Sequence, residues 1–164
     1  MITKTIIITL ISILLVFIII NMIGRFISRS GKKQLLDGEG LQTEMFAAKE
    51  WIVASLNASG YEVDYSLESL IEIDRFFDEQ NRPKGILSQH TGRIIFALGV
   101  YLGETVIANF GGNWVLDNCK SEIEIKLRVN NGKEIFPGIK VMERYQYGKA
   151  NSLYAYGQNL CKNK

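Results

Sequence analysis

Three charged side chains on apolar helical faces are the residues of this 164-residue chain best placed to do chemistry. Asp74 falls on the apolar stripe of a predicted helix, and Arg93 and Glu104 project from one side of the next helix. An unpaired charge on an apolar face is costly, so each of them needs an ion partner or a polar ligand. Eleven residues of helix hold Arg93 and Glu104 roughly 16 Å apart, too far to pair with each other.

Two interpretations of these charges stay open. The first is a set of buried ion pairs that fix the packing, with Asp74 bound to Arg93 and Glu104 bound to Arg144. The second is a small-ligand-binding domain or an enzyme that uses Asp74, Arg93 and Glu104. An open cleft lined by Arg93 and Glu104 would favour the second interpretation.

A stripe of glycines follows the same helix as Arg93 and Glu104. Gly92, Gly99 and Gly103 are spaced by seven and four residues, and each costs ~1 kcal/mol relative to alanine inside a helix. Close approach by a neighbouring backbone would compensate for this cost. The alternative is a ligand that lies against the bare backbone at Gly99 and Gly103.

Familiar signatures of catalysis and metal binding are missing from the sequence. His90 is the only histidine, and Cys119 and Cys161 do not have a metal-ligand spacing. No serine lies in a nucleophile elbow, and Gly111-Gly112 follows a predicted helix, whereas a phosphate loop follows a strand. We therefore expect no catalytic residue, no metal and no cofactor.

Hydrophobic periodicity predicts the elements that must position these residues. Apolar residues recur at three and four positions in the first part of the domain, while strict alternation of apolar and charged residues marks a strand ending at an Asn-Gly turn. The predicted helices cover residues 41–57, 66–80, 88–109, 138–147 and 151–160. The predicted strands cover residues 122–129 and 134–136, with a third strand at 114–116. The pattern is typical of a small α+β domain: three helices, a β-hairpin or three-stranded antiparallel sheet, and C-terminal helices.

An apolar run at the N-terminus predicts a transmembrane helix. From Ile6 to Gly24 the only strongly polar side chain is Asn21, and 19 helical residues span roughly 28 Å, close to the thickness of a bilayer core. A cleaved signal or a buried core helix is the alternative, but the run is long and lacks a small-residue cleavage site. We predict a single-pass anchor with its flank at 1–30, a linker at 31–40 and a globular domain at 41–164.

The charges around this run bear on orientation and on partners. Four basic residues follow it, and Lys4 alone precedes it, which favours a cytoplasmic domain. An ordinary stop-transfer flank is the favoured interpretation of the four residues, and contacts with anionic lipid headgroups are the alternative. An outward orientation stays possible, and a Cys119–Cys161 disulfide would support it. Residues 37–164 carry 14 basic and 17 acidic side chains, so the domain is mildly acidic and a nucleic-acid partner is not expected. The basic flank consists of Arg25, Arg29, Lys32 and Lys33.

Several short motifs together resemble a bacterial domain family of unknown function. They are Tyr101-Leu102-Gly103-Glu104, Gly111-Gly112-Asn113-Trp114, Asn131-Gly132, Pro137 with Val141 and Arg144, and Gly148 before Asn151-Ser152-Leu153. The resemblance covers about residues 66–157. It implies a small α+β domain and a bacterial source, and it brings no activity.

The function that these observations favour is a membrane-tethered, non-catalytic protein-interaction module. An immunity protein that neutralises a toxin from a competing cell is one concrete form, because such a role needs a surface and no chemistry. The partners expected are membrane lipid, through the N-terminal helix, and a protein.

Overall fold

The computed structural model describes residues 38–116 and 121–162. The predicted anchor, its basic flank, most of the predicted linker and Cys119 lie outside the described residues. The chain divides into a unit of residues 1–40 and a compact unit of residues 41–164.

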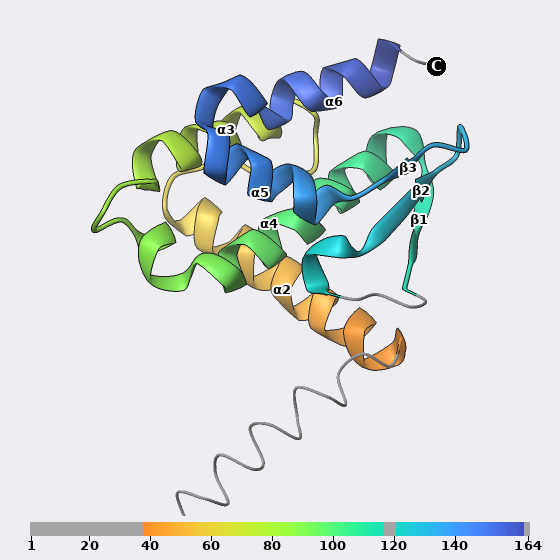
Figure 1. Ribbon diagram of the computed structural model, residues 1–164, viewed down its shortest axis with the longest axis horizontal. Coiled ribbons are helices and arrows are strands. Elements are labelled where there is room, and N and C mark those ends of the chain that lie inside the picture. The colour runs from red at the N-terminus through yellow and green to blue at the C-terminus, as the bar shows by residue number, and fades with distance from the viewer. Residues whose placement is uncertain (1–37, 117–120, 163–164) are drawn as a thin grey trace, which may run out of the picture. The chain divides into compact units, whose positions relative to one another are not determined.

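Five helices and a small antiparallel sheet make up the described residues, so the α+β prediction is confirmed at this level. Figure 1 gives the labels used below. The helices are α2 (Gly38–Ala58), α3 (Ser69–Gln80), α4 (Ile86–Phe110), α5 (Pro137–Tyr147) and α6 (Leu153–Lys162). The strands are β1 (Gly112–Val115), β2 (Lys126–Val129) and β3 (Glu134–Ile135), and two 3₁₀ turns are η1 (Glu122–Glu124) and η2 (Gly148–Asn151).

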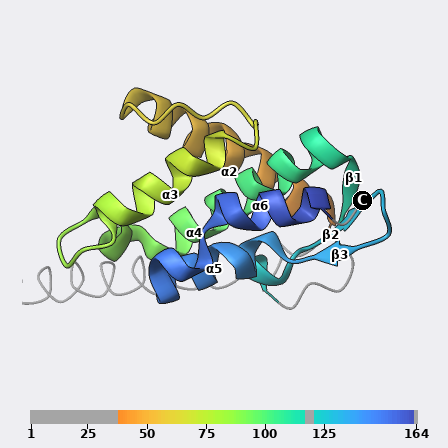
Figure 2. The ribbon, with the colours of Figure 1, turned by 90° about the horizontal axis from the view of Figure 1, so that it is seen from above.

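Helix α4 forms the centre of the core. It is almost wholly buried from Ile94 to Val106, and Figure 2 shows it running between α3 and α5 with the sheet at its C-terminal end. Among the described residues it is the one helix long and apolar enough to cross a membrane. About two thirds of its most apolar window is buried inside the domain, which is typical of a core helix.

The sheet has the order β1-β2-β3, and both strand pairs are antiparallel. Its inner face packs on the end of α4 and on α6, through a cluster that includes Val106, Leu127, Val129, Ile135 and Leu160. The hairpin turns at Asn130-Asn131-Gly132, where the sequence places it, with Gly132 at φ +84°. It is not the primed two-residue turn expected of Asn-Gly, because Asn131 keeps a negative φ and the Val129 N–H donates to the Lys133 carbonyl across a three-residue loop. Among the strands of the described residues, β1 lies on the edge of this sheet and has β2 as its one neighbour.

One predicted strand is too long. The alternation over 122–129 predicts a single strand, but residues 122–124 form η1 and pairing begins at Lys126. The burial of two isoleucines gives the reason. Ile123 packs against the main core cluster and Ile125 against a second cluster with Phe96 and Val100, and a strand would point both side chains to one face. The tighter turn directs them to different places.

The helix ends differ slightly from the predictions. Ser66 accepts a hydrogen bond from the Ser69 N–H at 3.1 Å, as a cap residue does, although α3 begins only at Ser69. Pro137 ends the hairpin as expected and is also the first residue of α5, a position where proline costs no hydrogen bond. Ser152 caps α6 by accepting from the Ala155 N–H at 3.1 Å.

Candidate functional site

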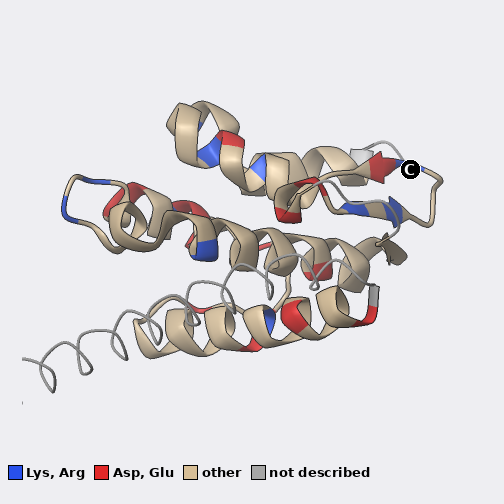
Figure 3. Ribbon diagram, turned by 60° about the horizontal axis from the view of Figure 1, so that its bottom comes forward, with Lys and Arg blue, Asp and Glu red and all other residues tan. Residues whose placement is uncertain are grey.

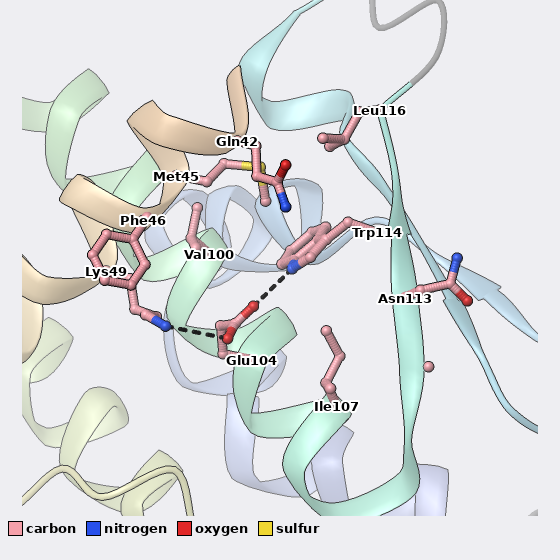
Figure 4. Close-up of a pocket in the computed structure, with 11 residues that line it drawn as sticks. Gln42, Met45, Phe46, Lys49, Val100, Glu104, Ile107, Asn113, Trp114 and Leu116 are labelled. Carbon is pink, nitrogen blue, oxygen red and sulfur yellow. Dashed lines mark hydrogen bonds and ion pairs between the residues drawn. The ribbon is translucent and has the colours of Figure 1, made fainter. Parts of the chain in front are cut away.

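An open groove of about 440 Å³ lies between α2 and β1, with α4 as its floor (Figure 4). Its lining is mainly apolar, and a few polar side chains come from all three elements. The lining residues are Gln42, Met45, Phe46, Lys49, Val100, Glu104, Ile107, Gly112, Asn113, Trp114 and Leu116. The volume falls within the range of sites that bind small molecules or side chains of a partner.

Helix α2 supplies one wall of the groove from a single face. Gln42, Met45, Phe46 and Lys49 are spaced by three, one and three residues, so they line up on one side of the helix. Met45 is buried, while Phe46 is 61% exposed, which is unusual for so large an apolar side chain. The Lys49 ammonium lies 4.9 Å from the centroid of the Phe46 ring.

Trp114 of β1 forms the opposite wall and depends on Gly103 for its place. A β-carbon at position 103 would lie 2.1 Å from Cη2 of the indole ring, so only a glycine leaves room for the ring against α4. The indole Nε1 donates to Glu104 Oε1 at 2.8 Å. Gly103, one of the three glycines of the predicted stripe, therefore makes the space in which the Trp114 ring packs against α4.

Glu104 is held at the floor of the groove by two donors. Besides the indole N–H on Oε1, Lys49 Nζ approaches Oε2 at 3.5 Å. Both charged side chains are partly exposed, at 19% for Lys49 and 28% for Glu104. The charges offset each other, and the carboxylate already has partners on both oxygens, so the pair suits binding and positioning better than proton transfer.

Arg93 lies elsewhere, and its predicted pairing is wrong. Its guanidinium stacks on the ring of Trp51 at 3.9 Å from the ring centroid, and the residue is exposed. An exposed cation needs no buried acid, so the pair Arg93–Asp74 is not required. Arg93 does not line the groove, and the cleft expected to hold both Arg93 and Glu104 holds only Glu104.

Asp74 is bound instead by Arg144, so the predicted pair of Arg144 with Glu104 is also wrong. Arg144 Nε donates to Asp74 Oδ1 at 2.6 Å, and Arg144 Nη2 donates to Asp78 Oδ1 at 2.7 Å. Burial lowers the pKa of the Arg144 guanidinium, but its bonds to the two carboxylates outweigh burial and raise that pKa overall. The Arg144 bond also lowers the pKa of Asp78.

The Asp74 carboxylate also caps α6. It accepts from the Ser152 hydroxyl at 2.6 Å and from the main-chain N–H groups of Leu153 and Tyr154 at 3.1 and 3.2 Å. A carboxylate at a helix N-terminus satisfies N–H groups that have no partner within the helix and interacts favourably with the helix dipole. This cluster joins α3, α5 and α6, and its contacts are those of a structural ion pair.

The other two glycines of the stripe have different surroundings. A β-carbon at Gly99 would lie 2.8 Å from the Gly138 Cα, so α5 approaches the backbone of α4 closely at this point. At Gly92 nothing lies within 4 Å. The close backbone approach expected for the stripe therefore occurs at Gly99, and Gly99 does not line the groove.

Tyr65, in the loop between α2 and α3, has a strained backbone conformation and contacts α4. Tyr65 has φ +64°, and α4 holds this conformation: the Tyr65 N–H donates to the Tyr101 hydroxyl, and the Asn109 amide donates to the Tyr65 carbonyl. Burial, followed by the nearby charge of Glu50, raises the pKa of the Tyr65 hydroxyl to about 12. These contacts hold the loop that carries Tyr65 against α4.

Sequence patterns did not predict the residues that form the walls of the groove. Phe46 and Lys49 were part of an ordinary amphipathic helix, and Trp114 was part of a short strand. One feature of the sequence could have indicated the groove: Phe46 is a large apolar residue outside the repeat formed by Leu41, Met45 and Ala48. Within the residues that the structure describes, no group of three metal-binding side chains occurs.

Comparisons with known proteins add no family or activity. No family model matches the sequence, no curated protein matches it, and no solved structure matches the fold. The resemblance to a bacterial domain family stays a prediction.

Proposed function

We propose that this protein is a membrane-tethered, non-catalytic recognition domain that binds a protein partner through the groove between α2, α4 and β1. The observation that carries the proposal is the character of the groove. It is open and mainly apolar, it presents the exposed ring of Phe46, and its one ion pair is internally satisfied. Such a surface gains free energy by burying apolar area and offers no reacting group.

The tether is the sequence-based part of the proposal. The apolar run from Ile6 to Gly24 has the length of a membrane span, and a basic flank follows it. The first helix of the domain supplies Gln42, Met45, Phe46 and Lys49, so the groove begins soon after the linker in the sequence. A partner that is itself at the membrane would meet the groove at high local concentration.

An immunity protein is one concrete form of this function. Neutralising a toxin requires a surface that covers the toxin, and the groove supplies a surface with an aromatic anchor on each wall, Phe46 and Trp114. The mild excess of acid over base in residues 37–164 favours a basic partner surface.

The proposal is tested by fractionation followed by affinity capture. We expect the full chain to sediment with membranes and to stay there in alkaline carbonate. From detergent extracts it should capture a partner that a Phe46→Ala variant captures at least tenfold less, because Phe46 is an exposed anchor of the groove. Tyr147→Ala is the matched control, since Tyr147 is 67% exposed and lies outside the groove. Equal capture by both variants would contradict the proposal.

A small-ligand-binding domain is the second candidate. The observation that favours it is the position of Glu104 at the floor of a groove large enough for a small molecule. Glu104→Gln keeps the shape and the indole hydrogen bond but removes the charge that attracts Lys49. Under the first proposal this variant loses stability, by about 1 kcal/mol or less for a partly exposed pair. Unchanged stability with lost binding of a small molecule would favour the second candidate.

A further inference from the structure

The groove opens beside the edge strand of the sheet. In the described residues, β1 pairs with β2 on one side only, and Gly112, Asn113 and Trp114 of β1 line the groove. An edge strand presents main-chain N–H and C=O groups that can pair with another extended chain. Which residues of β1 turn these groups outward can be read from the sheet register.

In an antiparallel pair, the residues of a strand turn their main-chain polar groups alternately to one neighbour and to the other. The Val129 N–H donates to the Lys133 carbonyl on the β3 side, and the Asn130 N–H donates to the Gly111 carbonyl on the β1 side. Arg128 therefore faces β1, where its register partner is Asn113. It follows that Trp114, the next residue, turns its main-chain N–H and C=O to the outer edge.

The elements around the groove carry an excess of acid. In residues 41–58 of α2, in β1 and in the stretch of α4 from Val100 to Phe110 there is one basic side chain, Lys49, against three acids. The acids are Glu44, Glu50 and Glu104. Figure 3 shows where acidic and basic residues lie along the ribbon. The inner lining is apolar, so the complementary ligand combines apolar side chains for the groove with positive charge at its ends.

We infer that the groove takes an extended peptide segment of the partner, which adds to β1 as a fourth strand and carries Lys or Arg beside its apolar residues. The added strand would lie about 4.8 Å from β1 and exchange main-chain hydrogen bonds with Trp114. Its alternate side chains then point onto the floor formed by Val100, Glu104 and Ile107. This inference rests on the proposed function and names the form in which the partner is recognised.

The test uses the full chain in lipid nanodiscs and a phage library of random linear 12-residue peptides as the probe. We expect the selected peptides to combine apolar residues with Lys or Arg, and to bind Phe46→Ala at least tenfold more weakly while binding Tyr147→Ala equally well. N-methylation of single peptide bonds should weaken binding about tenfold at alternate positions, because only every second N–H faces β1. In the complex, exchange of the Trp114 amide should slow.

The outcomes separate the inference from the proposal on which it rests. Peptides that need Phe46 but tolerate N-methylation at alternate positions would overturn strand addition and leave groove binding in place. Failure to select any peptide that depends on Phe46 would count against both. A third outcome is that peptides are selected only when residues 25–36 are deleted from the chain. That result would show that this basic segment itself fills the groove, and it would overturn the inference that a partner peptide is the occupant.

Discussion

Arg144 is the one charged side chain that is buried in the described residues, at 2% exposure. Replacing it in an Arg144→Met variant leaves Asp74 and Asp78 without their guanidinium partner. We expect the free energy of unfolding to fall by about 3 kcal/mol, because breaking a buried pair leaves an uncompensated charge. Denaturant unfolding followed by tryptophan fluorescence measures the change.

The matched control for this prediction is Arg128→Met. Arg128 pairs with Glu134 at 2.9 Å on the exposed face of the sheet, and such surface pairs contribute about 1 kcal/mol or less. Equal losses in the two variants would show that the Arg144 cluster is not the structural anchor described above.

The same cluster predicts sensitivity to acid. The bond from Arg144 holds the pKa of Asp78 below its ordinary value in the folded protein. This contribution to stability is therefore complete above the unfolded pKa of about 3.9 and is lost as the pH falls through the lower, folded value. Unfolding midpoints measured between pH 5 and pH 2 should fall less steeply for Asp78→Asn than for the wild type. Parallel profiles would contradict this assignment.

Residue pairing was the part of the site that sequence could not supply. Periodicity indicated that Asp74 needs a partner, and it has one, but the partner is Arg144, 70 positions away. The choice between Arg93 and Arg144 depends on how α3 and α5 pack, and no local pattern encodes this. Glu104 lies at the floor of the groove, whereas its partners Lys49 and Trp114 come from two other elements.

At the scale of elements, replacing a glycine of α4 by alanine should change stability in opposite directions at Gly99 and at Gly92. Gly99→Ala should destabilise by about 1–3 kcal/mol, because its β-carbon would collide with the Gly138 backbone, which cannot rotate away. Gly92→Ala should stabilise by up to ~1 kcal/mol, since it meets nothing within 4 Å and alanine favours the helix. Thermal unfolding of both variants provides the measurement. Stabilisation by Gly99→Ala would contradict the close α4–α5 contact.

The number and order of elements were predictable, and their exact limits were less so. Long amphipathic repeats and the Asn-Gly turn each depend on local sequence, so α2 to α6 and the hairpin were found. The start of β2 was missed because alternation over 122–129 also fits a turn followed by a shorter strand. Only the separate clusters around Ile123 and Ile125 decide between these alternatives.

At the scale of the whole molecule, two apolar segments have different roles in this account. Helix α4 is apolar because it is the buried core of the domain, whereas the run from Ile6 to Gly24 precedes the compact unit and is proposed as the tether. Deleting residues 1–30 should therefore release the chain from the membrane pellet without unfolding it. Fractionation together with circular dichroism checks both results. A deleted chain that still sediments with membranes would contradict the tether.

The most direct test of the account is photo-crosslinking from the groove in native membranes. p-Benzoylphenylalanine in place of Phe46 should give a cross-linked adduct with a protein partner in the membrane fraction, and the same probe in place of Tyr147 should give none. No adduct at position 46, or equal adducts at both positions, would contradict a partner-binding groove on a membrane-tethered domain.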